Sequence, residues 1–234
     1  MNAIIRPRFP AVAAAVLGAL IVAGFARTYY LRFLIDAPPL TVAAHLHGLL
    51  GTLWLVLHFT QARLIAAHRV QLHKQLGIFT VCVGVLLAIQ AFNLAVTNVA
   101  AGRAPAGRDP LQFLSVPLGT TTMFSLFLLG GVLLRRKREW HKRFMFFATL
   151  ALMVPAMARL ELLVMVPFGL PRAVLALWVT IALVAWAWWD DWRRFKRIHP
   201  AYLVGGVVLI ASLPLRRAIG MTDWWRPIAE WIVS

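Results

Sequence analysis

Residues 75–102, QLGIFTVCVGVLLAIQAFNLAVTNVAAG, contain no charged side chain. About 20 apolar residues are enough for a helix to cross the hydrocarbon of a bilayer, and few soluble helices have a stretch this long without a charge. This stretch therefore predicts a membrane-spanning helix, and the rest of the chain has to be read with lipid as its main solvent.

The composition of the whole chain supports the same solvent. Of the 234 residues, 61% are apolar and 14% are charged, whereas soluble domains carry roughly 25% charged residues. The formal net charge of +16 does not indicate nucleic-acid binding, because the basic residues lie in short clusters between apolar runs. The single cysteine, Cys82, can form no disulfide within the chain.

Apolar runs of spanning length recur along the sequence and predict one all-α transmembrane domain over residues 1–234, a bundle of about seven helices. Residues 222–233 are too short to span but are rich in tryptophan, which is typical of a helix lying in the membrane interface. Residues 1–26 resemble a signal peptide, but the apolar run continues beyond them, so we expect a retained first helix. The predicted spans are residues 10–33, 40–66, 72–98, 112–134, 142–166, 171–189 and 200–215.

Lysine and arginine predict the orientation, because cytoplasmic loops carry an excess of them. Fifteen of the 24 basic residues fall at one set of helix ends, so we expect that end and the N-terminus to be cytoplasmic, in the inner membrane of a bacterium. They are Arg6, Arg8, Arg63, Arg69, Lys74, Arg135, Arg136, Lys137, Arg138, Lys142, Arg143, Arg193, Arg194, Lys196 and Arg197.

Polar residues recur at one depth in the first five predicted helices, roughly 8–12 Å below the outer surface at 1.5 Å per residue. Polar groups inside a bilayer are costly and are candidates for function by default. The layer predicts either a ligand pocket or a structural network that holds helices together. It comprises Arg27, His45, His47, Gln90, Asn93, Ser115, Thr120, Thr121, Thr122, Arg159 and Glu161.

Arg159 carries most of this argument, because its guanidinium keeps its charge and needs an anion or carbonyl dipoles. Glu161 is the obvious partner, but residues two apart do not face each other on a helix unless Pro155 distorts it. We take His47, Arg159 and Glu161 as candidate catalytic residues, with Gln90 and Asn93 as ligand-binding residues. Arg27 can instead extend to the membrane surface.

The second predicted helix has a polar face of its own. His47, Trp54, His58 and Gln61 recur at helical spacing and share that face, whereas His45 points away from His47. We include Trp54, His58 and Gln61 among the ligand-binding candidates, although a hydrogen-bonded structural role fits them equally well.

Four more histidines lie at the predicted cytoplasmic end, and His73, His141 and His199 are the candidates for a metal site there. Neutral imidazoles are good ligands for divalent metals. Solvation at the interface is the alternative, because lysine and arginine surround these positions.

Several of these pieces together resemble a family of uncharacterised bacterial multi-pass membrane proteins. They are His45-Leu-His47-Gly48, Trp54, Gln61, residues 72–77 (LHKQLG), residues 141–145 (HKRFM) and Ala158-Arg159-Leu160. The resemblance supports a multi-pass fold and implies no activity. A more remote likeness to b561-type membrane cytochromes implies haem b held between histidines on neighbouring helices.

Two classes of function remain open from the sequence. In the first, the outer polar layer is a pocket of a redox protein, linked to quinone or haem, or of a lipid-modifying protein. In the second, the chain is a non-enzymatic structural or assembly subunit that binds other membrane proteins. Both place the chain in contact with the lipid bilayer, and neither involves nucleic acid.

Overall fold

The computed structural model describes residues 9–35, 39–105, 107–165 and 174–234, and every regular element in these ranges is a helix. A π-helix, η1 (Ala26–Tyr30), and a 3₁₀ turn, η2 (Arg32–Leu34), continue from the first α-helix. The predicted all-α class is confirmed. The α-helices are α1 (Phe9–Phe25), α2 (Val42–Ala66), α3 (Val70–Ala100), α4 (Pro110–Leu133), α5 (Arg138–Val164), α6 (Leu175–Phe195), α7 (Pro200–Gly220) and α8 (Trp225–Val233).

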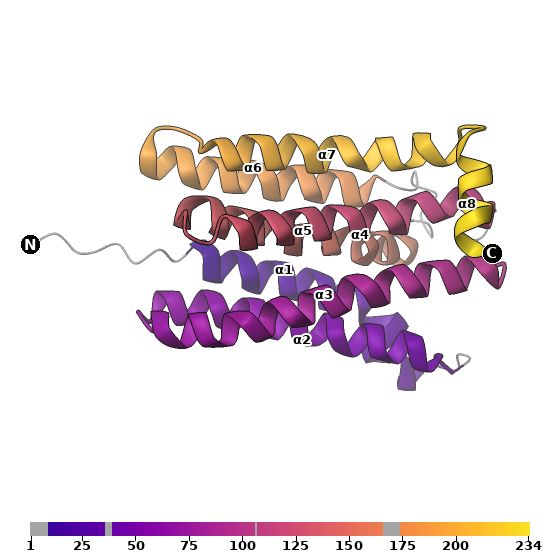
Figure 1. Cartoon of the computed structure of the whole chain (residues 1–234), viewed down its shortest axis with the longest axis horizontal. Coiled ribbons are helices and arrows are strands. Elements are labelled where there is room, and N and C mark those ends of the chain that lie inside the picture. Colours follow the sequence, from indigo (N-terminus) through magenta and orange to yellow (C-terminus); the bar gives the residue numbers. More distant parts are fainter. Residues whose placement is uncertain (1–8, 36–38, 106, 166–173) are drawn as a thin grey trace, which may run out of the picture.

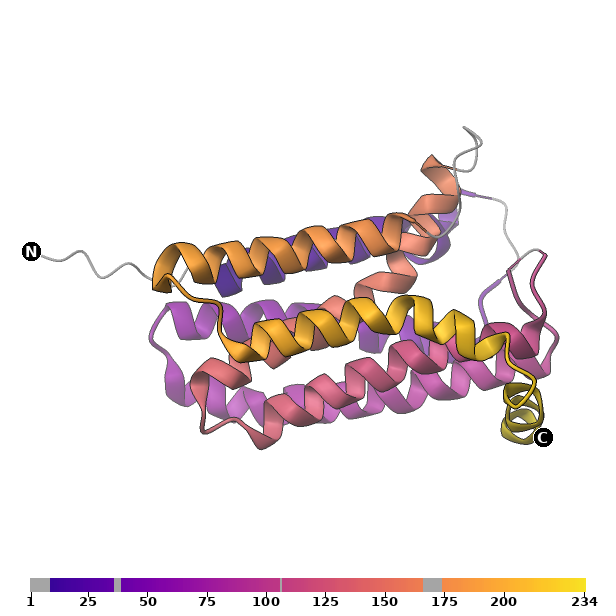
Figure 2. The same ribbon diagram turned by 90° about the horizontal axis from the view of Figure 1, so that it is seen from above.

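Helices α1 to α7 lie side by side along the long axis of the molecule, and α8 crosses one end of them (Figures 1 and 2). Among the described residues, six helices are long and apolar enough to cross a membrane, namely α1 with η1, α2, α3, α4, α5 and α7. Helix α6 runs beside α5 and α7 (Figure 1). The chain is therefore a multi-pass membrane protein with a short C-terminal helix.

Following the predicted orientation, we call the end of the bundle that holds the α4–α5 and α6–α7 connections the inner end. The other end, which α8 crosses, is the outer end (Figure 1). Side chains cap several helix starts: Thr41 accepts from the Ala44 amide at 3.2 Å and Asp109 from the Gln112 amide at 3.0 Å. Such caps satisfy amides that have no partner within the helix.

Helix α5 is the centre of the bundle, because it contacts α1, α4, α6 and α7. The approach of α1 to α5 depends on Gly24. A Cβ atom at that position would lie 2.4 Å from the carbonyl oxygen of Ala156, so only glycine lets the two backbones come this close.

A buried ion pair joins α5 to α6 at the inner end. Arg143, which is 1% exposed, donates to both carboxylate oxygens of Asp191, and Asp191 also accepts from the His199 amide at 3.0 Å. Glu139 accepts a further bond from Arg143, and Tyr202 places its ring 4.8 Å from the guanidinium carbon. Three helices and the α6–α7 connection thus meet at this ion pair.

Helices α6 and α7 extend furthest beyond the ends of their predicted spans. Helix α7 continues to Gly220 instead of ending near residue 215, because Arg216 finds acceptors inside the bundle. Helix α6 continues to Phe195, and the start of its predicted span at residues 171–173 lies outside the described residues.

Candidate functional site

Arg159 lies on α5 in the outer half of the bundle, one turn after Pro155. Its Nη1 donates to the Pro155 carbonyl oxygen at 2.9 Å, and its guanidinium carbon lies 4.5 Å from the centre of the Phe25 ring. Pro155 lacks an amide hydrogen. No carboxylate of the described residues forms an ion pair with Arg159. Within the described ranges, this cation therefore meets a carbonyl dipole and an aromatic face in place of a counter-charge.

His47 on α2 lies close enough to Arg159 to interact with its charge. Its Nδ1 is buried and has no hydrogen-bond partner among the described residues. His45 is exposed instead, with its ring 6.1 Å from that of Tyr29. The two histidines thus point in different directions, and His47 is the one that faces the bundle.

A third polar group in this region, Thr28, escaped the sequence reasoning. Its Oγ1 is buried and lacks a hydrogen-bond partner within the described ranges. Thr28 belongs to the π-helix η1 and follows Gly24 by four residues, so it continues the face of α1 that packs on α5. Single π-helical turns occur frequently at functional sites. We call Thr28, His47 and Arg159 the outer cluster.

Two tyrosines hold η1 against α2. Tyr29 donates to the His45 carbonyl at 3.2 Å, and its ring covers Gly48 so closely that a Cβ there would lie 2.3 Å from it. The Tyr30 hydroxyl lies 2.8 Å from Thr52 Oγ1. These contacts fix Thr28 and His47 relative to one another.

Glu161 lies on a different side of α5 from Arg159. It is 3% exposed, accepts from the Leu175 amide at 3.3 Å and interacts electrostatically with Arg217 of α7. The i, i+2 spacing therefore places the two charges on different sides of α5, although Pro155 lies one turn before Arg159 in the same helix.

The two predicted ligand-binding residues of α3 lie apart from the outer cluster. Gln90 donates to the Ala43 carbonyl at 3.0 Å and links α3 to the first turn of α2. Asn93 is exposed on the surface of α3. The structure thus brings together His47 and Arg159 but not the complete predicted set.

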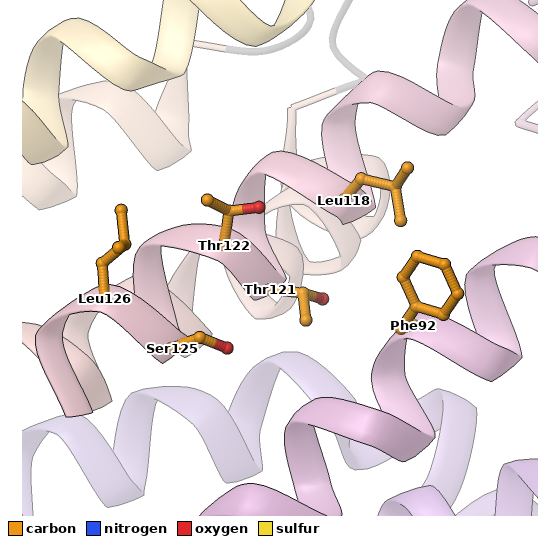
Figure 3. Close-up of a pocket in the computed structure, with 6 residues that line it drawn as sticks. All are labelled: Phe92, Leu118, Thr121, Thr122, Ser125 and Leu126. Atoms are coloured by element: carbon orange, nitrogen blue, oxygen red, sulfur yellow. The ribbon is translucent and has the colours of Figure 1, made fainter. Parts of the chain in front are cut away.

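A separate groove of about 290 Å³ lies between α3 and α4. Figure 3 shows Phe92 of α3 facing a row of α4 side chains, two threonines and a serine among them. Thr121 donates to the Pro117 carbonyl at 3.0 Å, so its hydroxyl is already satisfied. The lining residues are Phe92, Leu118, Thr121, Thr122, Ser125 and Leu126, and no residue of the outer cluster is among them.

The remaining residues of the polar face of α2 have partners inside the bundle. Trp54 is fully buried, donates to Thr149 Oγ1 at 3.2 Å and stacks on His58 with the ring centres 6.1 Å apart. The Gln61 side chain lies against Thr80 and His73. Trp54 and Gln61 thus connect α2 to α5 and α3.

His73 and His141 face each other near the inner end, with ring centres 6.2 Å apart. The His141 Nδ1 lies 2.8 Å from the Gly131 carbonyl, and the Gln61 amide lies against Nδ1 of His73. His58 interacts electrostatically with His141. His199 lies elsewhere, with its Nδ1 accepting from the Ala201 amide at 3.1 Å and its ring beside Trp140.

Burial lowers the pKa of His199 below its ordinary value, and the nearby charge of Arg143 lowers it further. Among the described residues, no group of three or more His, Cys, Asp or Glu side chains is placed to hold a metal ion. The metal site of His73, His141 and His199 stays a prediction, and the geometry joins only the first two of its members.

Arg216 of α7 is a buried cation that the sequence reasoning did not single out. It is 4% exposed, and it donates to Thr120 Oγ1 at 2.7 Å and to the carbonyl and hydroxyl oxygens of Ser212. Its methylenes pack on Gly119. Arg216 has three neutral acceptors where Arg159 has one, which makes Arg159 the less satisfied of the two.

No protein-family model, no curated protein and no solved structure matches the chain, so what stands is a multi-pass helical membrane protein whose family is not identified.

Proposed function

We propose that the chain binds the polar group of a membrane-soluble molecule, a quinone or a lipid, at the outer cluster. The observation that carries this proposal is Arg159, a half-buried residue with no carboxylate partner among the described residues, together with His47, which interacts with its charge and whose buried Nδ1 lacks a hydrogen bond; Thr28 Oγ1 on η1 is a second buried polar atom without one. Each such atom costs free energy until it is paired, and a bound polar group would pair them.

Each residue of the outer cluster has a distinct part in this binding. Arg159 supplies charge-assisted donors, which are roughly twice as strong as neutral ones. His47 can donate a hydrogen bond from Nδ1 or take up a proton. Phe25 holds the guanidinium in place through its ring face.

Replacing Arg159 by alanine should remove the ligand, because no other described side chain supplies a charge to the outer cluster. We expect Arg159→Ala to retain less than about a tenth of the co-purifying molecule, a loss of about 1.4 kcal/mol or more in binding. Arg159→Lys should restore only part, since a lysine lacks the planar fork of donors. Mass spectrometry of organic extracts from equal amounts of purified protein measures this.

The same purified proteins distinguish ligand binding from the alternative function, a structural or assembly subunit. Equal ligand content in the three proteins would exclude the outer cluster as the site. Protein that carries no small molecule but comes out of the membrane together with partner chains would favour the structural or assembly subunit.

A second candidate function is electron transfer through a haem held by His73 and His141. These imidazoles lie on α3 and α5 at a centre-to-centre distance of 6.2 Å, which is close to what two metal–nitrogen bonds of about 2 Å require. The Gly131 carbonyl accepts from Nδ1 of His141, which leaves Nε2 of that ring for the iron, whereas Nδ1 of His73 accepts from the Gln61 amide and would have to exchange this bond for an acceptor before its Nε2 could bind. A haem would supply one-electron redox chemistry.

The optical spectrum of the purified protein tests this second candidate. We expect a haem absorption band in the wild type that disappears in His73→Ala and His141→Ala. His199→Ala is the control and should keep the band, since His199 lies beside Trp140 instead. A colourless wild-type protein, or a band that survives both changes, would eliminate this haem site.

A further inference from the structure

We propose that the group bound by the outer cluster is a phosphate. This inference rests on the proposed function, and it chooses one ligand chemistry among those that the function leaves open. Three features support it: the charge of Arg159, the number of polar groups in the outer cluster, and the separate segments on which they lie.

The charge argues for an anion. Among the described residues, the guanidinium of Arg159 contacts the Pro155 carbonyl and the Phe25 ring, and neither neutralises it. Glu161, the nearest acidic residue in sequence, binds the start of α6 and interacts with Arg217. A quinone carbonyl would accept hydrogen bonds but leave a full positive charge within the bilayer, where a charge is costly. An anionic ligand removes that cost.

The number of polar groups argues for a ligand with several acceptor oxygens. The guanidinium has five N–H donors, and among the described residues it donates one hydrogen bond, to the Pro155 carbonyl. Thr28 Oγ1 and His47 Nδ1 are two further groups without partners in the described part of the chain. A carbonyl offers a single oxygen, whereas a phosphate offers three or more.

The separate segments that carry these residues favour a tetrahedral group. Thr28 belongs to η1, His47 to α2 and Arg159 to α5, so the three residues lie on three separate segments. A planar carboxylate is well suited to one guanidinium facing it. A tetrahedral phosphate can instead direct different oxygens toward different helices. The structure thus favours phosphate on a lipid headgroup or as a free anion.

The test measures thermal unfolding of the full-length protein in detergent with four separate additions. Phosphatidic acid is the main probe, and diacylglycerol is its match without the phosphate. Inorganic phosphate reports on a free anion, and decylubiquinone supplies carbonyl oxygens on a membrane-soluble ring. At about 100 times its dissociation constant, a bound ligand should raise the unfolding midpoint of the wild type by about 5–10 °C.

We expect phosphatidic acid to give this rise and diacylglycerol to give none. Arg159→Gln and Thr28→Val should abolish the rise. Arg27→Gln is the matched control, since Arg27 belongs to the same π-helix as Thr28 but is exposed, and it should retain the full effect. A rise with inorganic phosphate as well would identify a free anion as a second source of the same group.

Three outcomes would overturn the inference in distinguishable ways. Stabilisation by decylubiquinone or diacylglycerol in place of the phosphate compounds would remove the phosphate but leave the proposed function standing. Stabilisation by phosphatidic acid that persists in Arg159→Gln would place the phosphate outside the outer cluster. No stabilisation by any of the four additions, together with ligand-free extracts, would remove both proposals.

Discussion

Replacing Asp191 by alanine is expected to destabilise the folded chain by about 3–5 kcal/mol, because it leaves the buried Arg143 without its counter-charge. Arg143 is 1% exposed and donates two hydrogen bonds to this carboxylate. The His199 amide would lose its acceptor as well, so the α6–α7 connection should loosen together with the ion pair.

Asp190 gives the matched control at the neighbouring position. It pairs with Arg194 one turn away on the same helix at 2.9 Å, and the Arg194 side chain is 25% exposed. Asp190 is buried as well (8% exposed), but its partner Arg194 reaches solvent, and such partly exposed pairs contribute about 0–1 kcal/mol, so Asp190→Ala should cost less than Asp191→Ala. Denaturant-induced unfolding in detergent measures both. Equal losses for the two variants would show that the Arg143 pair has no special weight.

Replacing Gly24 by alanine is expected to cost about 1–3 kcal/mol, although it adds only one methyl group. The new Cβ would lie 2.4 Å from the Ala156 carbonyl oxygen, and a backbone atom cannot move aside as a flexible side chain can. Helix α1 must therefore separate from α5. Because η1 continues from α1, we expect the variant to lose the ligand of the outer cluster too.

Gly18→Ala on the same helix is the control, since a Cβ at Gly18 meets nothing within 4 Å. It should leave both the unfolding midpoint and the ligand content unchanged. A Gly24→Ala protein as stable as Gly18→Ala would mean that the close approach of the two backbones is not needed for the fold.

Apolar runs were enough to predict the fold, because a bilayer imposes one length on every span. The uncharged stretch in residues 75–102 lies within α3 and the turn that follows, and the short tryptophan-rich segment folds as α8. Helices α6 and α7 continue beyond the predicted spans, past charged residues that interrupt the apolar runs. Helix α7 continues through Arg216 because Thr120 and Ser212 accept its hydrogen bonds, and sequence alone does not show which side chains meet.

The candidate site shows the same limit. The depth of a residue in the membrane follows from counting residues along its helix, and this count predicted that His47 and Arg159 share one polar layer. Direction around a helix depends on neighbours, and here Glu161 and Asn93 turn away from the other two. Thr28 gave no signal because a lone threonine in an apolar run is ordinary. The π-helical turn that distinguishes it is a property of the folded backbone.

The contacts of helix α8 set an order in which the helices assemble during synthesis. The indole nitrogen of Trp225 donates to the Leu111 carbonyl at 2.8 Å, and Arg226 reaches Asp109 at 3.7 Å. These anchors belong to the start of α4, so α8 docks on a surface that exists only after the earlier helices have been made. A ribosome stopped before residue 225 should therefore leave a nascent chain whose α3–α4 loop is still open to protease.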